Sequence, residues 1–180
     1  MKIVLIGIQG SGKSTQGNLL SQKFNIPYLS TGHIFRELAR EHTPLGRYIK
    51  ETMNAGYLIS DDKTLEIVSE YLSRPEYNNG YILDGFPRTR IQAASFKNGI
   101  AYVFYINVSD KEALSRLSIR QDERGDSTVA ALAKRIELFH KFTEPVLDYY
   151  REKGVLHEIA GERSIEETNK EICDILTKNL

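Results

Sequence analysis

The sequence has little cysteine, no net charge and no long hydrophobic run, and each absence excludes a class of protein. A single cysteine, Cys173, leaves no disulfide framework within the chain and no zinc site of the four-cysteine type. Lysine plus arginine equal aspartate plus glutamate at 24 each, and the tyrosines form no stripe, so nothing indicates nucleic-acid or anionic-membrane binding. The apolar run at 3–6 is too short for a signal peptide or membrane span. We therefore expect a soluble, cytoplasmic protein of one domain covering 1–180.

The first chemical motif is a glycine-rich stretch directly after that apolar run. Gly7, Gly12, Lys13 and Ser14 match the pattern G-x-x-x-x-G-K-S/T, with a predicted strand before it and a predicted helix after it. Glycines allow backbone N–H groups to point at phosphate oxygens, and the helix adds its positive dipole end. We expect Lys13 to reach the β- and γ-phosphates and Ser14 to ligate Mg²⁺. The motif predicts a site for a nucleoside triphosphate.

Strand-like and helix-like segments alternate along the rest of the chain. Short apolar runs between turn residues predict strands at 3–6, 27–30, 81–84, 100–108 and 155–159. Amphipathic spacing and capping residues predict helices that begin near 13, 30, 46, 60, 110, 128 and 164. This alternation predicts an α/β fold with a parallel sheet flanked by helices and a ligand at the carboxyl ends of the strands.

Two segments exceed what a simple crossover between strands needs. The interval between the second and third strands, with an insert at 30–60, is helical throughout and too long for one crossover helix. The polar interval 121–127 interrupts the helical pattern that Asp110 is expected to cap, and Pro145 is expected to kink or restart the helix that follows. A phosphate-binding core with a helical insert and a polar flap indicates two substrates and a lid.

Basic residues on several elements carry the remaining chemical signal. Phosphoryl transfer depends on positioning and on positive charge around the transferred group. Arg88 directly follows the third predicted strand, at the edge where a parallel sheet binds its ligand. Arg120 and Arg124 flank the polar flap, so closure of the flap would complete the charge set and exclude water. Further positive charge comes from Lys13, Arg36 and Arg135.

Together these motifs resemble the adenylate kinases of the short-lid type, within the nucleoside monophosphate kinase family. The resemblance runs from Lys2 to the C-terminus and rests on GIQGSGKSTQ, STGHIFR, AGYLISD, DGFPRT, TEPVLDYY and the spaced arginines. DGFPR, at 84–88, is a specific signal of this family, whereas the phosphate-binding loop is shared by many others. The resemblance implies a three-layer P-loop fold, a monomer, and Mg²⁺-dependent transfer of the ATP γ-phosphoryl group to AMP, giving two ADP.

The resemblance also implies a role for each matching residue. The ATP side would comprise Gly10, Ser11, Gly12, Lys13, Ser14, Thr15, Arg116, Arg120 and Arg163. The AMP side would comprise Thr31, Arg36, Tyr57, Leu58, Ile59, Gly85, Phe86, Pro87, Arg88, Gln92, Arg124 and Arg135. Catalysis is assigned to Lys13, Arg88, Arg120, Arg124 and Arg135, and the metal to Ser14 and Asp84.

Three positions depart from the family pattern. His33 replaces a usual aspartate, which removes a carboxylate near Mg²⁺, whereas Ser14 replaces a usual glycine and adds a hydroxyl. The lid is shortened to R-G-D, with Ser127 at the place of a second acid. Two alternatives therefore stay open. One is a broader nucleoside monophosphate kinase that accepts UMP or CMP, since only Thr31 favours AMP, and the other is a nucleotide-binding module that has lost turnover.

Overall fold

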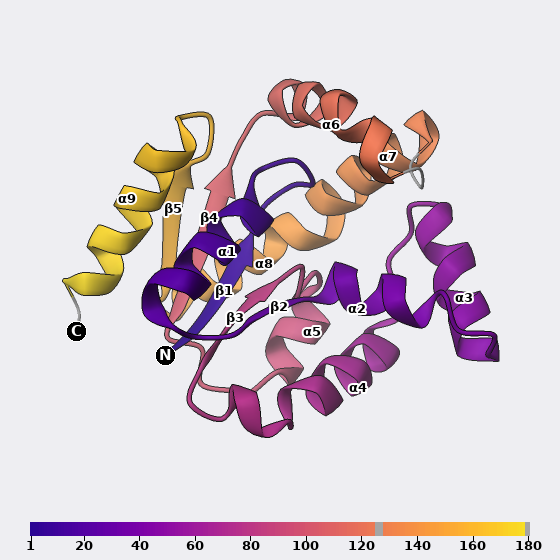
Figure 1. Ribbon diagram of the computed structural model, residues 1–180, viewed down its shortest axis with the longest axis horizontal. Coiled ribbons are helices and arrows are strands. Elements are labelled where there is room, and N and C mark those ends of the chain that lie inside the picture. The colour runs from indigo at the N-terminus through magenta and orange to yellow at the C-terminus, as the bar shows by residue number, and fades with distance from the viewer. Residues whose placement is uncertain (125–127, 179–180) are drawn as a thin grey trace.

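A computed structural model describes residues 1–124 and 128–178, including their side chains except at 119–124. Five strands form one parallel sheet in the order β2-β3-β1-β4-β5 (Figure 1). They are β1 (Lys2–Ile6), β2 (Tyr28–Ser30), β3 (Tyr81–Asp84), β4 (Tyr102–Asn107) and β5 (Leu156–Ala160). The predicted α/β fold with five parallel strands is confirmed.

The central strand β1 organises the sheet. Its residue Lys2 pairs with Tyr81 of β3, and Ile3 pairs with Tyr102 of β4, so β1 has a parallel neighbour on each side. Ile3 and Val4 point to opposite faces, and both are fully buried. Burial on both faces explains why β1 is a continuous apolar run rather than an alternating one. The chain leaves β1 toward β2 on one side of the sheet and later reaches β4 on the other, which creates a crevice at the carboxyl ends.

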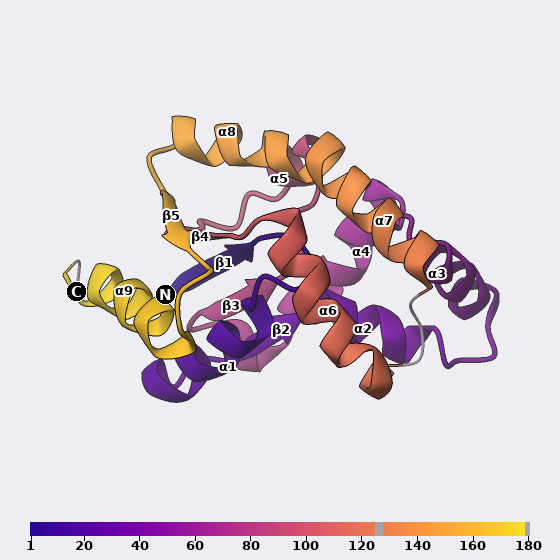
Figure 2. The same ribbon diagram turned by 90° about the horizontal axis from the view of Figure 1, so that it is seen from above.

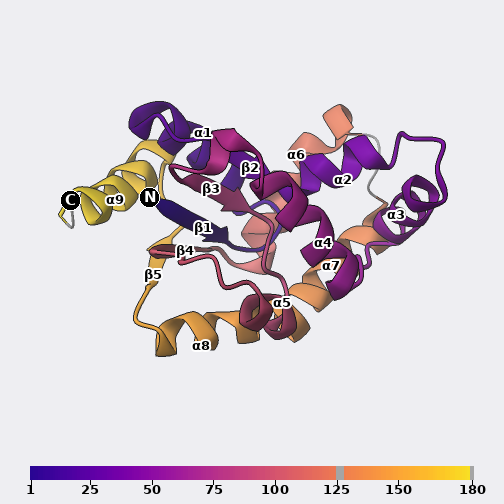
Figure 3. The ribbon, with the colours of Figure 1, turned by 90° about the horizontal axis from the view of Figure 1, so that it is seen from below.

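Helices cover both faces of the sheet and complete three layers (Figure 3). On one face lie α1 (Lys13–Phe24) and α9 (Ile165–Thr177), where Leu20 and Ile172 pack against Ile3 in a single apolar cluster. On the other face lie α5 (Arg90–Ser95) and α8 (Glu144–Glu152), and Val146 of α8 packs in a second cluster with Val4. Each such side chain contributes roughly 1.5–3 kcal/mol through burial.

The segment between β2 and β3 is helical, as predicted. It contains α2 (Thr31–Leu38), α3 (Pro44–Asn54), α4 (Asp61–Leu72) and the short helix η1 (Pro75–Tyr77). The side chain of Ser30 caps α2 by accepting a hydrogen bond from the His33 backbone N–H, and Thr43 caps α3 in the same way. Both α2 and α3 lie at the end of the molecule opposite α9 (Figures 1 and 2).

The next segment holds α6 (Asp110–Arg124), α7 (Val129–Leu138) and the π-helical turn η2 (Phe139–Thr143). Two expectations for α6 were wrong. Ser109, not Asp110, caps the helix, because the Ser109 hydroxyl accepts from the Glu112 N–H at 3.3 Å. The helix also continues past Gln121 to Arg124, since glutamine, glutamate and arginine are good helix formers despite their polarity. The other residues of the expected flap, 125–127, lie outside the described residues.

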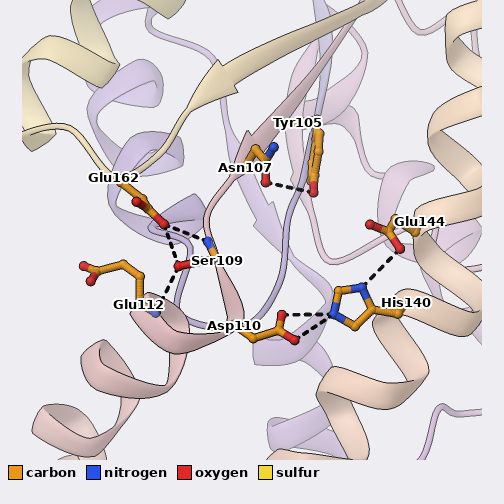
Figure 4. Close-up of polar contacts among 8 residues, drawn as sticks. All are labelled: Tyr105, Asn107, Ser109, Asp110, Glu112, His140, Glu144 and Glu162. Carbon is orange, nitrogen blue, oxygen red and sulfur yellow. Dashed lines mark hydrogen bonds and ion pairs between the residues drawn. The ribbon is translucent and has the colours of Figure 1, made fainter.

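The start of α6 is attached to the protein on two sides (Figure 4). Glu162, before α9, accepts hydrogen bonds from the backbone N–H and the hydroxyl of Ser109 at 2.8 and 2.7 Å. On the other side, His140 of η2 lies between two carboxylates, with Nε2 2.9 Å from Asp110 Oδ1 and Nδ1 3.1 Å from Glu144 Oε2. The same turn separates α7 from α8, which confirms the predicted interruption near Pro145. Among the described helices, none has both the length and the apolarity needed to cross a membrane.

Candidate active site

The glycine-rich loop joins β1 to α1 and faces open space. Gly10 and Gly12 both have left-handed backbone conformations, with φ of 90° and 95°. A Cβ atom on Gly10 would lie 2.7 Å from the carbonyl oxygen of Ala113, whereas one on Gly12 would meet nothing within 4 Å. Lys13 begins α1 directly afterwards, so the first backbone N–H groups of the helix open into the same space. The loop has the features of an anion-binding site.

A cleft of about 230 Å³ lies at the carboxyl ends of β1 and β3. It is bordered by the glycine-rich loop, by α2, by the link between α3 and α4, by the loop after β3, and by α7 and η2. Many of the predicted site residues line it together: Gly10, Gly12, Lys13, Ser14, Arg36, Tyr57, Leu58, Ile59, Asp84, Gly85, Phe86, Pro87, Arg88, Gln92 and Arg135.

Lys13 is folded back onto its own loop in the cleft. Its Nζ donates hydrogen bonds to the carbonyl oxygens of Gly7 at 2.7 Å and Ile8 at 2.8 Å. Burial lowers the pKa of Lys13 to about 8, and the nearby Asp84 carboxylate opposes this shift only in part. A bound phosphate would offer the ammonium group a stronger, charged partner and raise that pKa.

Arg88 lies at the centre of the positive charge in the cleft. Its Nε donates to the carbonyl oxygen of Gly85 at 2.7 Å, and its own carbonyl accepts from the Thr143 hydroxyl at 3.0 Å. Burial lowers the pKa of Arg88, Asp84 raises it, and the neighbouring guanidinium groups of Arg135 and Arg36 lower it further. Since arginine remains charged in proteins, the cleft holds three guanidinium groups whose mutual repulsion an anionic ligand would relieve.

Arg135, on α7, reaches across the cleft to two distant elements. Its guanidinium donates to the Gln9 side-chain oxygen at 3.2 Å and to the Met53 carbonyl oxygen at 3.0 Å. It therefore connects the glycine-rich loop with the end of α3. Gln9, Met53 and Thr143 line the cleft but were not predicted as site residues. Gln9 occupies a variable position inside the loop motif, and its place in that loop is the sequence feature that could have assigned it to the site.

Asp84 and Ser14 supply oxygen atoms of the kind that Mg²⁺ prefers. Asp84 is only 7% exposed, and its Oδ2 accepts a hydrogen bond from the Tyr28 hydroxyl at 2.7 Å, which fixes the carboxylate at the edge of the cleft. Thr31 donates to the Asp84 carbonyl oxygen at 3.1 Å. A carboxylate and a hydroxyl beside a phosphate-binding loop fit a magnesium ion that takes its other ligands from water and phosphate.

Other predicted residues do not line the cleft. Ser11 and Thr31 are buried behind its surface, and Thr15 lies in the first turn of α1. Arg116 is bound to Glu112 at 2.7 Å and to the Gly161 carbonyl at 2.9 Å, whereas Arg163 is exposed and pairs with Glu171. Two further predictions, Arg120 and Arg124, concern side chains outside the described residues. Their roles stay predictions.

A phosphate-binding loop after the first of five parallel strands, opening into a cleft with four basic side chains, defines a P-loop nucleotide-binding protein. The sequence model of the adenylate kinase family matches residues 5–155, and the chain belongs to that family. It is therefore a phosphotransferase of the nucleoside monophosphate kinases.

Named relatives match nearly the whole chain. An adenylate kinase of Caldicellulosiruptor bescii is 34% identical over 98% of this chain and 99% of its own length. The corresponding protein of Acetivibrio thermocellus is 33% identical over 98% of both, and that of Clostridium botulinum strain Loch Maree is 34% identical over 99% of this chain and 100% of its own. The first alignment has 212 positions, 32 more than the 180 residues of this chain, so that relative carries residues without a counterpart here.

Proposed function

We propose that this chain is an adenylate kinase that transfers the γ-phosphoryl group of Mg²⁺·ATP reversibly to AMP, giving two ADP. The observation that carries the proposal is the convergence of Lys13, Arg36, Arg88 and Arg135 on one cleft beside a phosphate-binding loop. Two polyanions must meet for this reaction, and their repulsion must be neutralised from several sides. Basic residues from four different elements around one space meet that requirement.

Each residue group has a role in the proposed reaction. The glycine-rich loop and Lys13 would hold the triphosphate, while Arg36 and Arg88 would hold the monophosphate on the other side. Arg135, which lies between the loop and α3, would contact the phosphoryl group in transit. When bound by Ser14 and Asp84, Mg²⁺ would neutralise charge on the ATP phosphates. We assign Arg120 and Arg124 to the same cleft when the lid closes.

We propose further that residues 30–60 form the monophosphate-binding insert and that residues 121–127 form a short lid. The Caldicellulosiruptor bescii relative carries residues without a counterpart in this chain, and a short lid here would account for part of them. We also propose that the protein is a cytoplasmic monomer, as the resemblance to short-lid adenylate kinases implies.

The test is an ADP-release assay with Mg²⁺·ATP against AMP, UMP, CMP and GMP. We expect the fastest turnover with AMP. Arg88→Ala should lower kcat on the order of 10³-fold or more, as expected for an arginine at a transferring phosphoryl group. Arg90→Ala removes an exposed arginine two residues away and should stay close to the unaltered chain. The proposal would be overturned by turnover with pyrimidine nucleotides alone, or by a lack of turnover with every acceptor.

A further inference from the structure

Gln92, in α5, is held by hydrogen bonds at both ends of its amide. The residue is only 2% exposed, yet it contributes to the lining of the cleft. Its Oε1 accepts from the Arg88 backbone N–H at 2.7 Å, and its Nε2 donates to Asp61 Oδ1 at 2.9 Å. The same Asp61 oxygen accepts from the Thr89 hydroxyl at 2.8 Å. Asp61 thus binds two side chains of the α5 segment from the first turn of α4.

These partners determine the positions of the oxygen and the nitrogen of the Gln92 amide. A backbone N–H can only donate and an ionised carboxylate can only accept, so Oε1 must face Arg88 and Nε2 must face Asp61. A glutamine amide has two N–H donors and two acceptor lone pairs. After the two observed bonds, one donor and one acceptor of Gln92 remain available, in a fixed order.

A fixed pair of one donor and one acceptor can distinguish the edges of related bases. Adenine presents an amino donor beside a ring-nitrogen acceptor, whereas hypoxanthine presents a carbonyl acceptor beside an N–H donor in the same places. An amide held in one orientation can pair with only one of these two edges. The other edge would leave polar groups unpaired, which is costly in a buried site. An amide free to rotate by about 180° could satisfy either order.

Resting on the proposed function, we propose that Asp61 is a specificity-determining positioning residue. It holds the Gln92 amide in the order that pairs with the adenine edge of AMP and rejects the inverted edge of IMP. Apolar side chains that line the same cleft, including Phe35, Ile59 and Phe86, offer the surface against which a flat base can pack. Asp61 does not touch the nucleotide; it acts through Gln92.

The experiment compares kcat/KM for AMP and IMP, at saturating Mg²⁺·ATP, in variants of the full chain. Asp61→Ala removes the carboxylate that holds the amide, and we expect the AMP-to-IMP ratio to fall tenfold or more, chiefly through KM. Asp62→Ala is the matched control, because Asp62 also lies in the first turn of α4 but is exposed. Asp61→Asn keeps an acceptor oxygen at the same place and should retain the ratio within about twofold.

A purely structural role of Asp61 would lower stability and both rates together, without changing the ratio. An Asp61→Ala ratio equal to that of Asp62→Ala would therefore overturn the inference. If circular dichroism shows that Asp61→Ala does not fold, Asp61→Ser gives the same test, because serine suits a helix N-terminus but is too short to hold Gln92. Absence of turnover with AMP in the unaltered chain would overturn the proposed function itself, whereas normal turnover with unchanged ratios would overturn this inference alone.

Discussion

The low pKa of Lys13 predicts that the nucleotide-free protein becomes more stable in alkaline solution. Burial lowers this pKa from 10.5 to about 8, so between these values the unfolded chain binds more protons than the folded one. Stability rises with pH wherever the unfolded state binds more protons. From pH 7 to pH 10, Lys13 should therefore raise the free energy of unfolding by about 2–3 kcal/mol.

The measurement is urea unfolding of the nucleotide-free protein at pH 7, 8, 9 and 10, compared with Lys13→Met. The variant cannot titrate at this position, so the difference between the two free energies of unfolding isolates the contribution of Lys13. Lys111→Met, which removes an exposed lysine, should follow the unaltered chain in parallel. Parallel profiles for the unaltered chain and Lys13→Met would refute the reasoning, because they would mean that the ammonium is as well solvated in the cleft as in the unfolded chain.

Two further changes test the loop after β3 and the attachment of α6. Gly85→Ala should lower the free energy of unfolding by roughly 1–3 kcal/mol, because the backbone there has φ of 82° and the new Cβ would lie 2.6 Å from the Thr31 hydroxyl. Gly154→Ala is the control, because the backbone there has φ of 69° and a new Cβ would meet nothing within 4 Å. Equal urea midpoints for the two variants would contradict a clash at Gly85. Burial disfavours the charged ring of His140, but hydrogen bonds to Glu144 and Asp110 outweigh it and raise the pKa. His140→Gln should therefore cost stability below pH 6.5 and progressively less as pH rises through the raised value; a thermal-midpoint difference constant from pH 5 to 8 would contradict this.

Features set by local sequence were predicted well. The glycine-rich loop needs positive φ at particular positions, and only a few residue types allow that geometry, so Gly12 and Lys13 could be placed from the motif alone. The central strand was predictable because burial on both faces requires a continuous apolar run. The continuation of α6 over 121–124 was not predicted, because the polarity of these residues suggested a break, whereas glutamine, glutamate and arginine are good helix formers.

The contacts that complete the cleft join residues far apart in the chain. Asp61 and Gln92 are 31 residues apart, and Arg135 is 82 residues from Met53. No local pattern encodes such pairs, because they depend on how α4 packs on α5 and on how α7 lies relative to the end of α3. The family resemblance implied that Gln92 belongs to the site, but the sequence did not indicate which side chain fixes its amide.

Charge and base recognition are separated in this cleft. Burial lowers the pKa of both Lys13 and Arg88, so the cleft holds cations in an unfavourable environment that any phosphate would improve. That gain depends on the phosphates and is the same for every nucleotide, since phosphate carries no information about the base. Selection among acceptors therefore depends on groups that face the base, and the Gln92 amide offers the base one donor and one acceptor. Because a neutral pair of hydrogen bonds discriminates only when its order is fixed, the Asp61 carboxylate would add to the selectivity of the kinase by fixing that order.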